Sequence, residues 1–448
     1  MTVAQAEAAE ALAVTDKSSV AKPADLPVSD RSRILLYLGV LVFIIAFGAP
    51  GGGLVGTGIF FFLKNRLHMG ASQIALYGLV AAIPSYLAFV PGFARDLWNP
   101  FGLRDRGYMI LFGGLCALGF AGFAFLPVSL ASLIALSIVV GSLWLFAQAG
   151  QTGLGATIAR QHVMSGQMST VMNVFGSIAV MIPLAAGGYM SDYLEKLPLS
   201  EAARELFLAG AAIMAFFALF AIWRPRVVYD NVHAEIGGEI HPLKDLARLV
   251  RHYPIWPAFA IWVLWNFAPG AGTPLQFHLQ NTLHANDAQA TLWNVLFAGG
   301  FIPTFLLFGW LCRRVPLRTL LIWGTVVAVP QMLPLLFVKT VSAALLGGFA
   351  SGLMGGVATA AYLDLMIRSC PKGLEGTMLM ASNALYFVIS QAGNVLGARL
   401  YEHFHTFTVC AISITVVYAL ILPTLLLVPR RLTATPDGIA PEGGFDRE

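Results

Sequence analysis

The sequence predicts an all-α membrane protein with twelve transmembrane helices, arranged as two six-helix repeats in the same orientation. Three observations lead to this fold class. The composition is too apolar for a water-soluble domain, charged residues are missing from long stretches, and segments of the first half recur in the second half. The paragraphs below justify the solvent, the spans, the orientation and the repeat in that order.

The composition requires lipid as the solvent. Hydrophobic residues make up 57% of the chain and charged residues 11%, and the mean hydropathy is +0.74, whereas a soluble domain carries about 25% charged residues. No charged residue occurs between Arg33 and Lys64, or between Arg106 and Arg160. A spanning helix needs ~20 apolar residues, so the first gap holds one helix and the second holds two. Helices are the expected elements, because lipid offers no partners for backbone polar groups.

Apolar runs of spanning length number twelve. The first six cover residues 34–63, 73–93, 108–126, 129–157, 167–190 and 205–223. The second six cover residues 254–280, 289–311, 317–337, 341–366, 376–400 and 406–428. The expected organisation is a disordered cytoplasmic tail (1–30), a six-helix bundle (31–223), a cytoplasmic loop (224–253), a second bundle (254–429) and a second tail (430–448), which we also expect to be disordered.

The basic residues indicate the orientation. With the N-terminus in the cytoplasm, eighteen lysines and arginines fall on the cytoplasmic side and six on the other. The positive-inside rule therefore places both termini in the cytoplasm. We expect the protein to lie in the plasma (inner) membrane. The lysines and arginines lie in short segments between the spans and do not form one patch. We therefore expect no nucleic-acid partner. In the central loop, Leu243–Val250 is amphipathic and predicts a short interfacial helix.

Two stretches 216 positions apart nearly repeat each other: FFLKNRLHMGASQ (Phe61–Gln73) and FHLQNTLHANDAQ (Phe277–Gln289). We interpret Asn65 and Asn281 as helix C-caps. A second set of matches lies late in each half, 210 positions apart. It pairs Gly166, Met168, Asn173, Gly187 and Asp192 with Gly376, Met378, Asn383, Gly397 and Glu402. Collinear matches at nearly constant offset indicate two copies of one six-helix unit.

The loop between the second and third spans reads GFARDLWNPFGLRDRGY, from Gly92 to Tyr108. Together with the parallel repeat, it resembles the loop signature of the major facilitator superfamily. The resemblance implies a cytoplasmic latch that breaks and re-forms during transport. Gly92 would permit close helix approach, and Asp96 would cap a neighbouring helix or pair with Arg104 or Arg106. The latch residues are Gly92, Asp96, Gly102, Arg104 and Arg106. The alternative is a solvated charged loop.

A narrower resemblance concerns three patches, RDLWNPFGLRDRGYMIL, FAPGAGTPLQFHLQNTLHA and RRVPLRTLLIW. They resemble the corresponding parts of folate–biopterin transporters, which implies a folate or pterin substrate. Muropeptide permeases, acetyl-CoA carriers and pigment-assembly proteins share parts of the loop.

Proline and glycine interrupt the first and seventh spans. Proline removes a helical hydrogen bond and glycine loosens what remains, so we expect these points to bend or to expose carbonyls to a ligand. Tight helix packing is the alternative. The candidate hinge residues are Pro50, Gly51, Gly52, Pro269, Gly270 and Pro274.

Polar side chains within the spans are the candidates for a substrate path. An amide buried without a partner costs on the order of 1–3 kcal/mol, so such residues usually face the bundle interior. Hydrogen bonds that hold helices together are the alternative role. The candidates are Gln148, Gln151, Thr152, Asn173, Asn266, Thr273, Gln276, His278, Asn383, Tyr386, Ser390, Gln391 and Asn394. Amides, hydroxyls and aromatics suit a neutral or heteroaromatic ligand.

Asp364, late in the tenth span, is the candidate for carrying a coupling proton. Arg368 follows four residues later, so a structural ion pair is the alternative.

These features favour a secondary transporter or facilitator that moves a small polar organic solute by alternating access, with proton symport as one form of coupling. A non-transporting membrane assembly or sensor protein on the same fold is the alternative. An enzyme is disfavoured because no catalytic constellation appears. We expect no cofactor and no metal, and a monomer in the bilayer.

Overall fold

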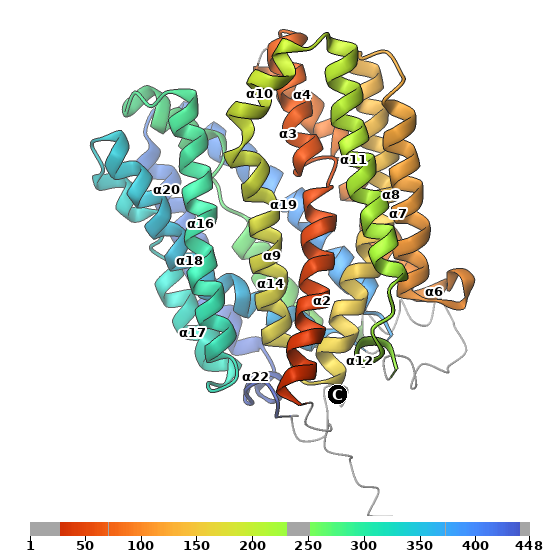
Figure 1. The fold of residues 1–448 in the computed structure, drawn as a ribbon. Coiled ribbons are helices and arrows are strands. Elements are labelled where there is room, and N and C mark those ends of the chain that lie inside the picture. The colour runs from red at the N-terminus through yellow and green to blue at the C-terminus, as the bar shows by residue number, and fades with distance from the viewer. Residues whose placement is uncertain (1–26, 70, 231–250, 372, 440–448) are drawn as a thin grey trace, which may run out of the picture.

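The computed structural model describes residues 27–69, 71–230, 251–371 and 373–439. Its helices run side by side along one axis (Figure 1). The helices of the first half are α2 (Val28–Phe47), α3 (Leu54–Phe61), α4 (Ala71–Ala81), α5 (Ile83–Tyr86), α6 (Phe89–Leu97), α7 (Asp105–Phe123), α8 (Leu130–Gln161), α9 (Ser165–Ala185), α10 (Gly187–Lys196), α11 (Leu199–Ile222) and α12 (Arg226–Tyr229).

The second half begins after the central loop. Its helices are α14 (Ile255–Asn266), α15 (Thr273–Phe277), α16 (Asp287–Leu311), α17 (Leu317–Ala328), α18 (Val341–Ser369), α19 (Glu375–Phe404), α20 (Phe407–Ala419), α21 (Ile421–Thr424) and α22 (Arg430–Thr433). Short 3-10 turns cover Pro100–Gly102, Leu333–Phe337 and Leu425–Leu427. The interfacial helix predicted over Leu243–Val250 lies outside the described residues.

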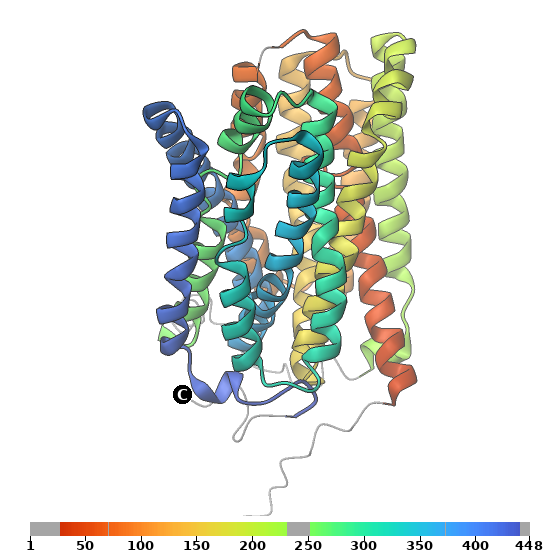
Figure 2. The same cartoon turned by 90° about the vertical axis from the view of Figure 1, so that its left-hand side faces the viewer.

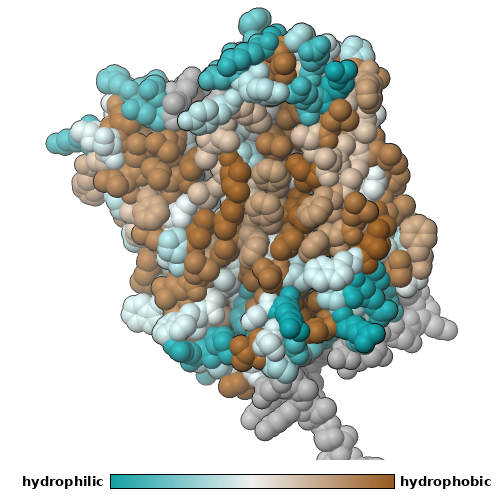
Figure 3. Space-filling model, in the orientation of Figure 1, coloured by the Kyte–Doolittle hydropathy of each residue, from teal (hydrophilic) through white to brown (hydrophobic). Residues whose placement is uncertain are grey.

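The surface confirms an integral membrane protein. On the face that Figure 3 shows, apolar residues form a band across the middle, and polar residues gather at the two ends. Within the described residues, eight helices are long and apolar enough to cross a membrane. The fold is the predicted one, with twelve spans in two six-helix repeats.

The four spans outside that set of eight are either interrupted or polar. The first, second and seventh spans are each divided into shorter helices: α2 and α3, α4 to α6, and α14 and α15. The eleventh span, α19, is continuous but carries the polar stripe that includes Asn383 and Asn394. Interrupted or polar segments are tolerated in a membrane where they are buried in protein or line a wet cavity. These four spans are therefore the places to look for a site.

The repeated sequence has a repeated conformation. A π-helical turn occupies Phe62–Arg66 in the first half and His278–Thr282 in the second. Each turn is followed by a histidine in the left-handed region, with φ 51° at His68 and 58° at His284. The interpretation of Asn65 and Asn281 as C-caps was wrong, because both lie inside the π-turn and the following histidine takes the left-handed position.

Both predicted tails need correction where they are described. Helix α2 begins at Val28, inside the stretch expected to be a tail. Residues 430–439 form α22 and an ordered segment, in which the side chain of Asp437 is fully buried. The expectation of disorder was wrong for that segment, because Asp437 has ionic and backbone partners inside the bundle.

Candidate functional site

A cavity of about 1000 Å³ opens at one end of the bundle, between the two halves. We call this the cavity end. The walls come from α3, α9 and α10 of the first half and from α15, the π-turn after it and α16 of the second. The polar residues that line it are Thr57, Lys64, Asn65, Ser191, Asp192, Gln276, Gln280, Thr291 and Asn294. Hydroxyls, amides and one charge of each sign therefore face this cavity.

Of the predicted path residues, Gln276 lines this cavity. Most of the other lining residues were missed, although two carried a signal. Asn65 belongs to the repeated FFLKNRLH stretch and Asp192 to the second set of matches. Their second-half equivalents, Asn281 and Glu402, are not among the residues that line the cavity.

The breaks in the first and seventh spans are confirmed. Gly51 and Gly52 follow the end of α2 and line the cavity, and a Cβ atom on either would meet open space. In the seventh span the Oδ1 atom of Asn394 accepts a hydrogen bond of 2.9 Å from the backbone N–H of Thr273, the first residue of α15. That contact from α19 supports the restarted helix.

The prolines of the seventh span have different places. Pro269 lies in the break between α14 and α15, and Gly270 beside it has φ 123°, a left-handed value that favours glycine. Pro274 was wrongly counted as a helix breaker. It lies in the first turn of α15, where its missing N–H has no helical partner to lose.

One pair of predicted path residues joins the halves. The Nδ2 atom of Asn383 on α19 lies 3.4 Å from Oε1 of Gln148 on α8, and Asn383 donates. Three other candidates, Thr152, Asn173 and Asn266, donate to backbone carbonyls one turn back in their own helices.

The remaining candidates lie in separate surroundings. Gln151 is buried, and its Nε2 atom has no hydrogen-bond partner among the described residues. His278 stacks on Phe407, with ring centroids 4.8 Å apart. Ser390 is half-buried on α19, and the other two candidates on that helix, Tyr386 and Gln391, are exposed.

The opposite end of the bundle is closed by the loop after the second span, and we call it the latch end. Asp96 accepts hydrogen bonds from the backbone N–H groups of Gly376 (3.2 Å) and Thr377 (2.6 Å) at the start of α19, and from the Thr377 hydroxyl (2.6 Å). A carboxylate here meets unpaired N–H groups and the positive end of the helix dipole. The predicted capping by Asp96 thus agrees with the geometry.

The glycine of this loop allows the close approach that the sequence predicted. A Cβ atom on Gly92 would lie 2.5 Å from the carbonyl oxygen of Gly376 and 2.7 Å from the Cβ of Met380. Helices α6 and α19 can therefore meet at this point only with a glycine at position 92.

The predicted arginine partners of Asp96 were wrong. Its ionic partner is Arg95, at 2.6 Å. Arg106 instead donates to the carbonyls of Ala221 and Ile222 at the end of α11 and lies over the ring of Tyr229. The remaining latch candidates, Gly102 and Arg104, have positive φ values of 69° and 47° in the turn before α7.

Several charged residues of the latch end were not predicted. Arg95 also pairs with Asp105 at the start of α7. Arg160, at the end of α8, pairs with Glu375 at 3.1 Å, with both side chains buried. A single charged residue at the end of an otherwise uncharged span, such as Arg160, was the available signal.

Asp364 forms the ion pair that was one of its two predicted roles. Nε of Arg368 lies 2.9 Å from Oδ1 of Asp364, and Nη2 lies 3.2 Å from Oδ2. This two-point geometry is the strongest form of an arginine–carboxylate contact.

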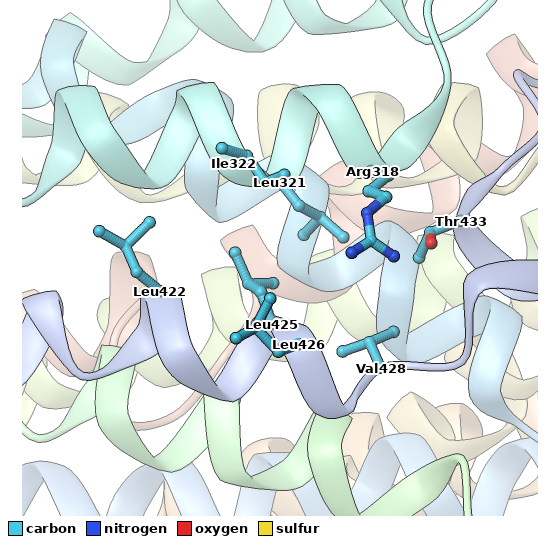
Figure 4. Close-up of a pocket in the computed structure, with 8 residues that line it drawn as sticks. All are labelled: Arg318, Leu321, Ile322, Leu422, Leu425, Leu426, Val428 and Thr433. Carbon is cyan, nitrogen blue, oxygen red and sulfur yellow. The ribbon is translucent and has the colours of Figure 1, made fainter.

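A second, smaller pocket of about 240 Å³ lies outside the route between the two halves. It lies between α17 and the α21–α22 region, and Arg318 and Thr433 stand at one end of an otherwise apolar slot (Figure 4). All of its lining residues belong to the second half of the chain, so it is not on a route between the halves.

A bundle of twelve spans with a cavity at one end and a latch at the other is the architecture of a polytopic membrane transporter. The sequence model of the Major Facilitator Superfamily matches residues 146–398, and the chain belongs to this superfamily. None of the curated proteins compared with the chain matches it.

Solved structures share the fold. One is a Major Facilitator Superfamily transporter, FucP, in the outward conformation, with a TM-score of 0.67, 14% sequence identity, and coverage of 88% of this chain and 98% of that one. Another is the human organic anion transporter MFSD10 (TETRAN), with a TM-score of 0.62, 15% identity, and coverage of 89% and 100%. At these identities the likeness concerns the fold alone.

Proposed function

We propose that the protein is a secondary carrier that moves a small polar organic solute across the inner membrane by alternating access. The observation that carries the proposal is the contrast between the two ends of the bundle. Both halves line a cavity of about 1000 Å³ at the cavity end, whereas a buried ion pair and a helix cap join the halves at the latch end. Such a contrast is expected of a carrier in one of its two end states.

With both termini in the cytoplasm, the cavity end faces outward and this state is outward-open. Residues 31–223 and 254–429 would then move as two bodies around the breaks at Pro50 and Pro269. The helix breaks support this role, because the backbone there has fewer helical hydrogen bonds to lose when the spans bend.

The ligand that fits best is polar and of moderate size. Pockets of ~300–1,000 Å³ suit drug-sized ligands, and amide and hydroxyl groups line this cavity, with Lys64 and Asp192 as charges of opposite sign. A zwitterionic or neutral heteroaromatic solute matches that lining. A folate or pterin is the specific candidate, on the resemblance of the three sequence patches alone.

Proton coupling through Asp364 is the coupling mechanism we propose. The carboxylate is held by Arg368 at two points, so protonation would have to accompany separation of that pair. Uptake with and without a pH gradient, in the wild type and in Asp364→Asn, tests this step. Uptake that is equal under both conditions in the wild type would remove the proton from the mechanism.

The main experiment is uptake into vesicles that contain the purified protein. Pterins, nucleosides, sugars and peptides are first compared by thermal stabilisation of the detergent-solubilised protein, and the ligands that stabilise are then assayed for uptake. We expect Gln276→Ala to raise KM, because its amide lines the cavity. The matched control is Thr424→Ala, an exposed hydroxyl that donates to a carbonyl of its own helix. Stabilising ligands that are bound but never taken up would favour the non-transporting assembly or sensor protein.

A further inference from the structure

The second half of the chain has a counterpart of the Gly92 contact. A Cβ atom on Gly309 of α16 would lie 2.8 Å from the side chain of Thr170 on α9. Thr170 and Met380, the neighbour of Gly92, follow Gly166 and Gly376 at the same distance in the repeat. The two glycines therefore occupy equivalent positions, each at a crossing between the halves.

At this second crossing, the loop after Gly309 has no counterpart of the Asp96 carboxylate. Asp96 follows Gly92 by four residues, but the residue four positions after Gly309 is Arg313, which is exposed. The loop between α16 and α17 therefore offers no carboxylate to the start of α9. By the symmetry of the repeat, that helix start needs one.

Asp437 supplies it from the other end of the chain. Its Oδ1 atom accepts from the backbone N–H of Gly166 at 3.2 Å, and its Oδ2 atom accepts from that of Gln167 at 2.9 Å. Gly166 and Gln167 are the repeat equivalents of Gly376 and Thr377, which Asp96 caps. Asp437 thus repeats the Asp96 contact.

The segment that carries Asp437 is held by the second half. Arg368 donates to Asp437 Oδ1 at 2.9 Å and to the carbonyl of Thr435 at 2.8 Å. The backbone N–H of Asp437 donates to the carbonyl of Cys312 at 2.9 Å. Figure 2 shows α22 and the segment after it running along the lower edge of the bundle, at the latch end.

We propose that residues 430–439 form a gate strap, in which Asp437 replaces the missing loop carboxylate and closes the latch end between α9 and α18. Opening of that end has to break the bonds from Gly166 and Gln167 to Asp437. The proposal takes from the proposed function only that this end opens and closes.

Cys312 provides a built-in reporter for the strap. Its Sγ atom lies 3.7 Å from Oδ2 of Asp437, and the residue is buried. The rate of alkylation of Cys312 by N-ethylmaleimide, measured by mass spectrometry on the full-length protein in vesicles, therefore reports how often the strap leaves. Cys116 and Cys410, buried elsewhere, report general unfolding in the same sample.

In Asp437→Ala we expect Cys312 to react about tenfold faster, the scale of a lost helix cap, with Cys116 and Cys410 unchanged. Asp437→Asn keeps one acceptor oxygen and should give an intermediate rate. It also keeps the test decisive if the alanine variant unfolds and all the cysteines react. The matched control is Asp230→Asn, an exposed aspartate whose ionic partner is Arg224.

A second substitution tests whether Asp437 takes the place of the carboxylate that the loop lacks. Adding Arg313→Asp to Asp437→Ala returns a carboxylate to the position equivalent to Asp96, and we expect protection of Cys312 to return. Unchanged Cys312 reactivity in both Asp437 variants would overturn the proposal. Because no substrate is used, this result is separate from any failure of uptake.

Discussion

Arg160 at the end of α8 and Glu375 at the start of α19 form a buried ion pair of 3.1 Å that joins the two halves of the chain. Arg160 is the last residue but one of α8, and Arg368 has the same place in α18. Glu375 corresponds to Ser165 in the repeat. Arg368 donates to the Ser165 hydroxyl at 3.0 Å. Both crossings at the latch end thus use an arginine at the end of one span against the start of a span in the other half.

Glu375→Gln should loosen the first of these crossings. A hydrogen bond between charged groups contributes about 1.5–3 kcal/mol, and the neutral amide loses part of that contribution in the closed state. We expect Cys370, buried at the end of α18, to be alkylated ten- to a hundredfold faster, a range that corresponds to about 1.4–2.8 kcal/mol. The double variant Arg160→Gln with Glu375→Gln should recover part of the protection, since the buried guanidinium charge is removed together with the carboxylate charge. If Cys370 is alkylated as fast in the double variant as in Glu375→Gln, the Arg160–Glu375 pair is not a contact that closes the latch end.

Gly92→Ala should hinder closure by steric overlap. The added Cβ would lie 2.5 Å from the backbone carbonyl oxygen of Gly376, which cannot rotate away. We expect faster alkylation of Cys370 and a shift of the resting population toward a state open at the latch end. Gly114→Ala on α7, where a Cβ would meet open space, is the matched control. Equal Cys370 reactivity in the two variants would show that α6 and α19 do not need this close approach.

The sequence predicted the parts of this molecule that depend on solvent and symmetry. Charge-free runs located the spans, because a bilayer imposes span length. The duplicated stretches predicted two copies of one unit, and these stretches share a conformation, although the π-turn itself was not predicted. Asp96 was placed correctly, since glycine, aspartate and the following basic cluster lie within one loop.

Other contacts were not predicted because their partners are distant in the chain. The partners of Asp437 lie 69 to 272 positions away, and its segment is polar and lacks a periodic pattern, so it appeared to be a disordered tail. Likewise, Arg104 and Arg106 were expected to pair with Asp96 from proximity in sequence. The neighbouring Arg95 took that role, because the turn at Gly102 directs Arg106 toward α11.

Asn383→Ala should impair transport without opening the latch end. Its hydrogen bond to Gln148 is long, at 3.4 Å, so its loss should cost only about 1 kcal/mol of stability. We propose that Asn383 lies on the substrate path, so its loss should instead raise KM for uptake severalfold. Alkylation of Cys312 and Cys370 should stay at wild-type rates. Faster alkylation with an unchanged KM would assign Asn383 to helix packing, the alternative role that its sequence position allows.

Docking of the gate strap should strengthen as the pH falls. Burial, and then the neighbouring Asp364, raise the pKa of Asp437 from 3.8 to about 6 in the docked strap, against the opposing effects of Arg368 and the two backbone donors. A released aspartate returns to its ordinary pKa near 3.9, so the docked strap takes up a proton between about pH 4 and pH 6. The stabilisation from that proton is fully present below the ordinary pKa and is lost as the pH rises through 6.

The measurement is the ratio of Cys312 to Cys116 alkylation between pH 5 and pH 7.5, since the ratio cancels the chemistry of the thiol itself. Besides Asp364 and Arg368 on α18, Cys312 on α16 is the titratable group that faces Asp437. Burial and Asp437 raise the pKa of Cys312, so it stays a thiol throughout this range. We expect the ratio to rise severalfold from pH 5 to pH 7.5 in the wild type and to stay flat in Asp437→Ala. A ratio that rises equally in both would assign the titration to a group other than Asp437.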